Sequence, residues 1–300
     1  MGFVKSTSSE VSPRATRRQM FRPSLAMPRI LTLLPMHALL ATAARVEPVS
    51  DHSCRLLLIR HGQTNFNAEG RLQGRLESEL TELGHNQAHG VGEWLRDSGE
   101  AQTVRQSFVS PRKRTLQTLA NIEAHAKLPQ SLVRPGLREI ELTVWEGQLK
   151  NALLNGEGQP DSERWERWEA HPDGFVFDED GHSPLAHLKL RAAEEWQALL
   201  AATSSASTSL IVAHGAFNKV FILTALGLPV DDYGFRDVSQ RFELGNCAAV
   251  ELCWSAGDPH ASAWRLRYPS ETPWSTREQE LEIRARDLRE LAESEGKGEL

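Results

Sequence analysis

The chain has 300 residues, of which 40% are hydrophobic and 25% charged, and its formal net charge is −6. This length and composition are typical of a soluble globular protein with one large or two small domains. The negative charge argues against a general nucleic-acid-binding surface, which needs a basic face. A site for an anionic ligand would therefore have to be a local group of basic residues.

The first 50 residues differ from the rest in charge. They carry seven Lys or Arg and two Glu, whereas the remainder carries 27 basic and 38 acidic residues. Residues 1–29 resemble an organellar transit peptide, and the apolar residues 30–44 resemble a signal-peptide core. This apolar part, interrupted by Pro35 and His37, is too short to span a bilayer comfortably. We predict that residues 1–50 are a disordered or cleavable targeting segment for a plastid or mitochondrion, with the secretory pathway or cytoplasm as alternatives and no stable membrane insertion.

A run of four apolar residues at 56–59 is followed by Arg60, His61 and Gly62. Such a run is typical of a strand that is buried on both faces of a parallel sheet. Gly62 allows the chain to turn tightly where the strand ends. Because ligands bind at the carboxyl ends of strands in open α/β sheets, Arg60 and His61 are candidate site residues. For His61 alone, the alternative is a structural histidine at a strand end.

A loop and a helix are predicted next. Residues 65–74 hold two Gly, two Asn and a Gln, so we predict a loop rich in hydrogen-bonding groups that can contact phosphate or substrate. Thr81 is expected to cap a helix, because apolar residues recur after it at helical spacing. The residues predicted near its inner face are Leu83, Gln87, Val91, Trp94 and Leu95.

Residues 108–110 are predicted to form a short strand, and Pro111 suits the first turn of the helix that follows. This turn carries the three cations Arg112, Lys113 and Arg114. Cations there oppose the helix dipole and cost stability unless an anion lies nearby. We expect Arg112 and Lys113 to point to solvent and Arg114 to point inward.

The middle of the chain is less regular. Residues 132–133 are compatible with a short strand, and residues 137–147 are expected to be a loop with some extended structure. Residues 148–182 contain many Gly, Pro and acidic residues and predict an irregular lid or insertion with one short helix. Trp165 and Trp168, three positions apart, are expected to be packing residues.

A second strand–His–Gly unit follows. Residues 184–203 predict an amphipathic helix, and residues 210–215 repeat the earlier pattern of an apolar run that ends in His214 and Gly215. A helix over residues 216–226 is expected directly after it. This unit is the strongest internal repetition in the sequence.

The last elements are two strands and a helix. Residues 248–254 and 263–268 predict an antiparallel pair at a sheet edge, because a Gly-Asp-Pro turn separates them. Ser275 and Glu278 have the spacing of a capping box, which would open a charged helix to about residue 294. That helix is polar nearly all round and is therefore expected at the surface or against a partner.

Five polar residues stand at predicted strand ends or in the following loops: Arg60, His61, Arg114, Glu139 and His214. Guanidinium groups suit phosphate, because they can bind it bidentately. A neutral histidine can attack phosphorus, and a carboxylate can protonate a leaving alkoxide and then activate water. No set of acids or of Cys and His has metal-ligand spacing, so we expect no metal and no other cofactor. The cysteines are predicted to be buried small hydrophobes: Cys54, Cys247 and Cys253.

The order of these residues resembles the histidine phosphatase superfamily, branch 1. Four ordered blocks between about residues 54 and 268 carry the similarity: residues 60–74, 110–118, 137–147 and 212–215. A late strand at residues 246–248 adds to it. The resemblance implies an α/β fold of the phosphoglycerate mutase type, a three-layer α/β/α sandwich with a mostly parallel central sheet. We predict that this domain covers residues 51–272, with a lid insertion at about 148–182, and that residues 273–300 form a charged C-terminal helix and tail.

The resemblance also implies roles for the five core residues. His61 would be the nucleophile that becomes phosphohistidine. Arg60, Arg114 and His214 would hold the phosphoryl oxygens, and Glu139 would be the general acid and base. Further candidate substrate-binding residues are Thr64, Asn67, Gln73, Gly74 and Gly215.

Two positions depart from the family pattern. Thr143 stands where many members have Gly, and His182 stands where Glu is common. Thr143 lies in the acidic loop, residues 137–147, and His182 lies in the lid, so both bear on substrate specificity more than on phosphohistidine chemistry.

The predicted function is a metal-independent phosphomonoesterase that acts through phosphohistidine on a small phosphorylated metabolite. Sugar phosphates, sugar acid phosphates and phosphoserine are the expected substrate classes; no nucleic-acid partner is expected, and a homodimer is allowed. A cofactor-dependent phosphoglycerate mutase is one alternative, but the lid holds only Lys150, Arg164 and Arg167 as basic residues, and the loop after Gly74 lacks the mutases' tryptophan. The other alternative is a non-catalytic phospho-ligand-binding pseudoenzyme, although all five core residues are present.

Overall fold

The computed structural model describes residues 53–155, 160–203, 206–241, 244–269 and 275–295. The predicted targeting segment, residues 1–50, lies outside these ranges. None of the helices within them is long and apolar enough to cross a membrane.

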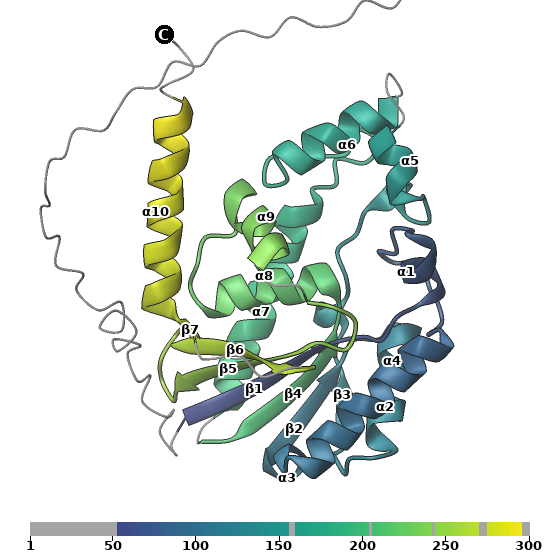
Figure 1. Ribbon diagram of the computed structural model, residues 1–300, viewed down its shortest axis with the longest axis vertical. Coiled ribbons are helices and arrows are strands. Elements are labelled where there is room, and N and C mark those ends of the chain that lie inside the picture. The colour runs from purple at the N-terminus through teal and green to yellow at the C-terminus, as the bar shows by residue number, and fades with distance from the viewer. Residues whose placement is uncertain (1–52, 156–159, 204–205, 242–243, 270–274, 296–300) are drawn as a thin grey trace, which may run out of the picture. The chain divides into compact units, whose positions relative to one another are not determined.

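A seven-stranded sheet organises the described residues, with the strand order β3-β2-β4-β1-β5-β6-β7 (Figure 1). The strands β3, β2, β4 and β1 are paired in parallel, and β5, β6 and β7 add an antiparallel side. The predicted mostly parallel sheet and the predicted antiparallel pair are both confirmed. The strands are β1 Ser53–Arg60, β2 Val104–Val109, β3 Ser131–Val133, β4 Thr208–Ala213, β5 Ala249–Ser255, β6 Ala263–Tyr268 and β7 Ser275–Thr276.

Helices cover both faces of the sheet, as expected for a three-layer α/β/α sandwich (Figure 1). Leu57 and Ile59 of β1 belong to the hydrophobic core that contains α2 (Glu82–Asp97) and α4 (Lys113–Glu123). Leu56 and Leu58 belong to the core that contains α7 (Pro184–Ala202) and α8 (Gly215–Ala225). All four side chains are at most 1% exposed, so each contributes roughly 1.5–3 kcal/mol of burial free energy. The apolar run therefore forms the predicted strand that is buried on both faces.

The lid contains two helices instead of the single short helix that was predicted: α5 (Lys150–Asn155) and α6 (Pro160–Ala170). Trp165 and Trp168 of α6 are 4% and 6% exposed and contact Trp145 and Phe175, respectively. The predicted packing role of both tryptophans is therefore confirmed. The remaining helices are α1 Asn65–Glu69, α3 Glu100–Thr103, α9 Asp232–Arg241 and α10 Arg277–Glu295, with 3-10 turns at Pro135–Leu137 and Thr143–Trp145.

Of the two predicted loops, one contains a helix. The predicted loop 65–74 contains α1, because the Thr64 hydroxyl accepts a bond from the Asn67 N–H (3.1 Å) and the Asn67 side chain accepts one from the Thr64 N–H (3.2 Å). This reciprocal pair is a capping box, and the sequence analysis overlooked it. The region 137–147 is a loop with one 3-10 turn at Thr143–Trp145 and extended backbone at Arg138 and Glu146, in agreement with the prediction.

The starts of the helices also differ from prediction in detail. Leu83 is 52% exposed, because the inner face of α2 is made of Gly84, Ala88 and other small or apolar residues. The box that opens α10 joins Thr276 to Gln279, one residue later than predicted. Pro111 precedes α4, whose capping residue is Arg112.

The cations at the start of α4 are compensated from the loop before α2. Glu77 accepts a hydrogen bond from the Lys113 backbone N–H (2.8 Å) and pairs with Arg112 (3.3 Å). Glu79 pairs with the Lys113 ammonium group. The anions that the helix dipole requires are thus supplied by the protein. Arg114 points inward and is 0% exposed, as predicted.

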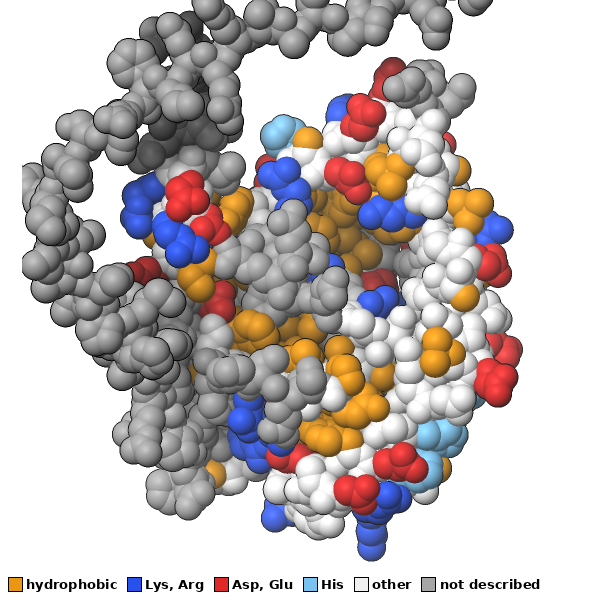
Figure 2. Space-filling view, viewed as in Figure 1, with side chains coloured by type: hydrophobic (Ala, Val, Ile, Leu, Met, Phe, Trp, Pro, Cys, Tyr) orange, Lys and Arg blue, Asp and Glu red, His pale blue; other side chains and the backbone are white. Residues whose placement is uncertain are grey.

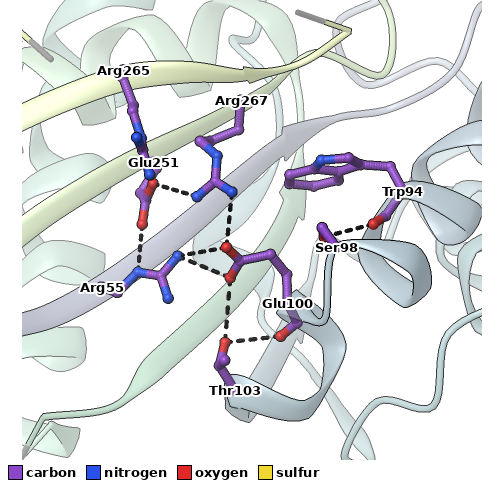
Figure 3. Close-up of polar contacts among 8 residues, drawn as sticks. All are labelled: Arg55, Trp94, Ser98, Glu100, Thr103, Glu251, Arg265 and Arg267. Carbon is purple, nitrogen blue, oxygen red and sulfur yellow. Dashed lines mark hydrogen bonds and ion pairs between the residues drawn. The ribbon is translucent and has the colours of Figure 1, made fainter. Parts of the chain in front are cut away.

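A network of five charged residues ties β1, β5, β6 and α3 together (Figure 3). Glu251 is bonded by Arg55, by Arg265 (2.8 Å) and by Arg267 (2.7 Å). Glu100 is bonded by Arg55 (2.8 Å) and Arg267 (2.9 Å). Burial alone would raise the pKa of Glu251, but the neighbouring arginines outweigh it and hold this pKa below its ordinary value. The network therefore depends on an ionised Glu251.

We predict that Glu251→Gln lowers the free energy of unfolding by about 3–5 kcal/mol at pH 7, because it removes the buried carboxylate to which Arg55, Arg265 and Arg267 bond. A carboxylate with a lowered folded-state pKa stabilises the protein above the unfolded pKa of about 4.3 and loses this effect as the pH falls through its folded value. The difference between wild type and variant should therefore shrink only below about pH 4. Urea denaturation at several pH values measures it.

The matched control is Glu194→Gln on the exposed side of α7, which should stay within about 0.5 kcal/mol of wild type. A loss for Glu251→Gln no larger than this control would show that the network does not stabilise the fold.

Candidate active site

The turn after β1 is set by close backbone packing. A Cβ atom at Gly62 would lie 2.4 Å from the Gly84 carbonyl oxygen, and one at Gly84 would lie 2.0 Å from the Gln63 oxygen. The Gly62 N–H donates to the Thr118 hydroxyl of α4 (3.0 Å). Only glycine fits at both contacts. The first turn of α2 therefore packs directly against the backbone of Gly62 and Gln63, the residues that follow His61.

His61 is held as a neutral imidazole with a defined tautomer. Its Nδ1 donates to the Gly62 carbonyl oxygen (2.8 Å), so Nε2 carries the free lone pair. The ring is 2% exposed. Burial, and then Arg114 and Arg60, lower the pKa of His61 well below its ordinary value of 6.5. At neutral pH, His61 therefore has an unprotonated Nε2.

Arg114 is fixed by three bonds to the protein. Its Nε donates to His214 Nδ1 (3.2 Å), and its Nη1 and Nη2 donate to the carbonyl oxygens of Leu76 and Gly74 (both 3.0 Å). Burial lowers the pKa of Arg114 to about 10, which still leaves the guanidinium charged at neutral pH. Its remaining N–H groups can donate to an anion.

His214 supports Arg114 from behind. Because its Nδ1 accepts from Arg114, its proton is on Nε2, which donates to the Ser110 hydroxyl (2.7 Å). The ring is 0% exposed, and its centroid lies 5.3 Å from that of His61. Burial and the charge of Arg114 lower the pKa of His214 well below 6.5. Two neutral imidazoles and one guanidinium thus pack together.

Arg60 provides a second guanidinium. Its Nη1 donates to the Leu244 carbonyl oxygen (2.6 Å), whereas its buried Nε has no hydrogen-bond partner among the described residues. Buried polar atoms without partners are rare, and they often face a ligand site. A Cβ atom at Gly215 would lie 3.3 Å from this Nε, so glycine leaves room for the guanidinium.

Glu139 is held at the N-terminus of α8. Its carboxylate accepts backbone N–H bonds from Ile140 (2.9 Å), Ala216 (3.2 Å) and Phe217 (2.9 Å). α8 begins immediately after His214, so one chain segment positions both the second histidine and the carboxylate.

A cavity of about 810 Å³ lies over these groups, between the ends of the strands and the lid. Figure 2 shows a hollow below α6 in which hydrophobic, basic and acidic side chains meet. The volume is that of a small-molecule site and exceeds what a phosphoryl group alone needs. Seven of the predicted site residues line it: Arg60, His61, Asn67, Gln73, Gly74, Arg114 and Glu139.

Three predicted site residues do not line the cavity. His214 lies behind Arg114, with both ring nitrogens bonded to the protein. Thr64 is 0% exposed and caps α1, so its hydroxyl serves the fold. Gly215 packs against Arg60. These residues shape the site from outside the cavity wall.

The sequence analysis missed groups that orient the site. Ser110 fixes the tautomer of His214, and the Leu244 carbonyl holds Arg60. The Asn246 amide donates to the His61 carbonyl oxygen (3.0 Å) and to Asn67 Oδ1 (3.2 Å). Because Asn67 Oδ1 faces Asn246, the amide hydrogens of Asn67 point away from Asn246. The available signal was that Ser110 and Asn246 are the first, polar residues of the matched segments 110–118 and 246–248.

The sequence analysis also missed several cavity-lining residues. Trp165 and Trp168 line the cavity in addition to packing in the lid. The unassigned basic residues of the lining are Arg71, Lys150, Lys219 and Arg236. Across the described ranges, no group of three or more His, Cys, Asp or Glu residues is placed to hold a metal ion. The three cysteines are buried and unbonded to one another, as predicted.

The chain is similar to curated proteins of two kinds. It is 33% identical to a probable 2-carboxy-D-arabinitol-1-phosphatase of Arabidopsis thaliana over 73% of this chain and 42% of the relative. It is 32% identical to a probable phosphoglycerate mutase GpmB of Erwinia tasmaniensis over 70% of this chain and 89% of the relative. The chain thus spans less than half the length of its plant relative.

The fold is also found in solved structures. The phosphoserine phosphatase of Entamoeba histolytica, solved in complex with 3-phosphoglyceric acid, aligns with a TM-score of 0.55 and 26% identity, covering 74% of this chain and 97% of that one. This likeness confirms the predicted phosphoglycerate mutase-like architecture.

The family match covers nearly the whole described domain. Residues 56–267 match the histidine phosphatase superfamily (branch 1), a range that begins in β1 and ends in β6. It includes every residue placed in the cavity above, so the predicted resemblance is confirmed. The chain belongs to the histidine phosphatase superfamily, branch 1.

Proposed function

We propose that this chain is a phosphomonoesterase that acts through a phosphohistidine intermediate on a small phosphorylated metabolite. The observation that carries the proposal is a neutral His61 in a cavity wall that also contains Arg60, Arg114 and Glu139. A phosphoryl group needs a nucleophile, positive charge around its oxygens and a proton for its leaving group. His61 would supply the nucleophile, Arg60 and Arg114 the positive charge, and Glu139 the proton.

In the first step, the Nε2 lone pair of His61 forms a bond to phosphorus and the ester P–O bond breaks. The carboxyl proton of Glu139 passes to the leaving alkoxide. Arg60 and Arg114 stabilise the charge on the transferring oxygens, because donors fixed in advance need no reorganisation during the reaction. The product alcohol leaves, and phosphohistidine remains.

In the second step, water attacks phosphorus while the Glu139 carboxylate takes its proton. The P–N bond breaks, inorganic phosphate leaves, and His61 is neutral again. Both steps balance in atoms and charge without a metal or an organic cofactor. We therefore propose that the reaction is metal-independent, with the two guanidiniums supplying the positive charge.

We favour hydrolysis over the mutase alternative. The loop after Gly74 directs Glu77 and Glu79 to α4, and the lid's Lys150 is paired with Glu169 (3.6 Å). The substrates we propose are sugar phosphates, sugar acid phosphates or phosphoserine, which fits the phosphatase names among the relatives. The presence of all five core residues in one arrangement favours an enzyme over a binding module.

We also propose that residues 1–50 direct the protein to a plastid or mitochondrion. Their seven basic and two acidic residues and their apolar end support this.

The purified chain should release phosphate from an aryl phosphate, with unchanged rate in excess chelator. His61→Ala should lower kcat/KM by at least about a thousandfold, because it removes the nucleophile. Acid-labile phosphate bound to the protein should be trapped from wild type and absent from the variant. Phosphate assays and rapid-quench labelling measure these results.

His89→Ala is the control, because His89 contacts His125 outside the cavity lining and should leave activity unchanged. Activity that requires an added divalent metal would contradict metal independence. Labelling that persists in His61→Ala would contradict the assigned nucleophile.

Glu139→Gln should slow the first step by about 10²–10⁴-fold for an alkyl phosphate, since the alkoxide then lacks its proton donor. The leaving group of dinitrophenyl phosphate needs no proton. For this substrate, Glu139→Gln should therefore lower the single-turnover rate of phenol release far less. Glu141→Gln, two residues along and ion-paired with Arg138 (3.9 Å), is the matched control. Equal losses for both substrates would rule out Glu139 as the general acid.

A fluorescent protein fused behind residues 1–50 should enter an organelle of a plant cell and be shortened there. Replacing Arg14, Arg17 and Arg18 by Glu should prevent entry, since transit peptides are poor in acidic residues. Fluorescence microscopy and an immunoblot give the result. Diffuse cytoplasmic fluorescence of the unmutated fusion would contradict the proposal.

A further inference from the structure

Part of the cavity wall comes from α9 and the lid. Phe235 and Arg236 of α9 and Trp168 of α6 line the cavity, and none of them takes part in the proposed phosphohistidine steps. The rings of Phe235 and Trp168 are in contact, with their centroids 5.9 Å apart. Because the phosphoryl group is expected beside Arg60 and Arg114, the rest of the cavity is available to the alcohol portion of a substrate, and this wall bounds it.

The start of α9 is joined to the lid. Asp232, the first residue of the helix, accepts a hydrogen bond from the Asp173 backbone N–H through Oδ1 (2.7 Å). Its Oδ2 contacts Nδ1 of His171 (3.2 Å). Since Phe235 and Arg236 follow Asp232 within about one helical turn, a shift of this end of α9 would move the cavity wall.

The same end of α9 is joined to α10, Arg277–Glu295. Arg284 donates through Nη2 to Asp231 Oδ2 (2.6 Å), and its guanidinium carbon lies 5.0 Å from the centre of the Tyr233 ring. The Tyr233 hydroxyl donates to Asp287 of α10 (3.0 Å). These contacts place α9 between α10 and the lid (Figure 1).

Arg284 is fitted closely to the start of α9. Its side chain is 13% exposed, and a Cβ atom at Gly234 would lie 3.0 Å from its Nη1, so glycine leaves room for the guanidinium. Asp231 caps α9, because its Oδ1 accepts a bond from the Gly234 N–H (2.7 Å). Burial would raise the pKa of Asp231, but this N–H and Arg284 outweigh burial and lower it. Arg284 therefore stabilises the carboxylate that begins the helix.

α10 lies beyond residue 267, where the match to the family ends. The bond from Arg284 to Asp231 therefore joins a helix outside the matched range to a cavity wall inside it. Within the described ranges, neither Arg114 nor Glu139 bonds to a residue of α9 or α10, so both should keep their positions when this bond is removed.

Resting on the proposed phosphatase function, we propose that Arg284 is a positioning residue for substrate binding. Through Asp231 it holds the start of α9, and α9 in turn holds Phe235 and Arg236 in the wall that bounds the alcohol portion of the substrate. The contact thus affects how tightly a substrate with a large alcohol portion binds, and it leaves phosphoryl transfer itself unchanged.

Two ligands that are not hydrolysed separate the two parts of the cavity. Inorganic phosphate fills only the phosphoryl site, whereas naphthylmethylphosphonate also has a large group that reaches toward α9. In the full-length protein, Arg284→Met should weaken binding of naphthylmethylphosphonate about threefold to tenfold and change binding of phosphate by less than about twofold. Titration calorimetry measures both affinities, and hydrogen exchange at the α9 amides should be faster in the variant.

Two further variants complete the test. Asp231→Asn keeps an oxygen that can cap α9 but loses the charge, so it should weaken naphthylmethylphosphonate as Arg284→Met does. The double variant should be no weaker than either single one, because both changes remove the same bond. Arg289→Met is the matched control, since Arg289 is exposed on the same helix and bonds to no described residue of α9, and it should leave both affinities unchanged.

Turnover of naphthyl phosphate gives a second measurement. Arg284→Met should raise KM and leave kcat within about twofold, because a loss of uniform binding appears in KM. A residue that only stabilised the fold would instead lower the active fraction, and hence kcat, without a change in KM.

Unchanged affinity of Arg284→Met for naphthylmethylphosphonate would overturn the proposal, as would equal losses for this ligand and for phosphate. Additive losses in the double variant would overturn the route through Asp231. If naphthyl phosphate is not hydrolysed but the affinities differ as expected, only the phosphatase function is refuted. Hydrolysis with the same KM in wild type and Arg284→Met would refute only the positioning role.

Discussion

The site depends on the parallel pairing of β1 with β4. The register sets Ile59 opposite Val212 and Arg60 opposite Ala213, and the His61 N–H donates to the Ala213 carbonyl oxygen (3.0 Å). Both strands end at the same edge, so the two histidines lie side by side. A shift of one residue would turn every side chain of β1 to the opposite face. The two buried cores therefore fix the position of His61.

The same pairing determines where charge is placed. α8 starts directly after His214, and its first N–H groups hold Glu139, while His214 itself holds Arg114. The carbonyl oxygens of Gly74 and Leu76 bind this guanidinium without neutralising it. The positive charge of Arg60 and Arg114 favours an anion in the cavity and disfavours protonation of His61. A chain with net charge −6 can thus bind an anionic substrate.

Much of the fold and of the reaction centre could be predicted from the sequence, because both rest on local patterns. The apolar run at 56–59 indicated a doubly buried strand, and of the three cations at the start of α4, Arg114 was expected to point inward. Contacts between distant residues could not be predicted. The bond from Ser110 to His214 spans 104 positions and that from Asn246 to His61 spans 185, so no spacing rule reveals them.

The floor and the walls of the cavity come from different kinds of element. Strand ends and the helix N-terminus form the floor, whose groups are held by several bonds each. The walls come from the lid and the acidic loop, where both departures from the family pattern lie. Thr143 has a φ of 41°, a conformation in which a non-glycine residue costs roughly 1–2 kcal/mol, and His182 bonds to the Glu141 carbonyl oxygen (3.0 Å). Since neither residue lines the cavity or touches the floor, changes here can alter the shape of the walls while the phosphoryl chemistry stays the same.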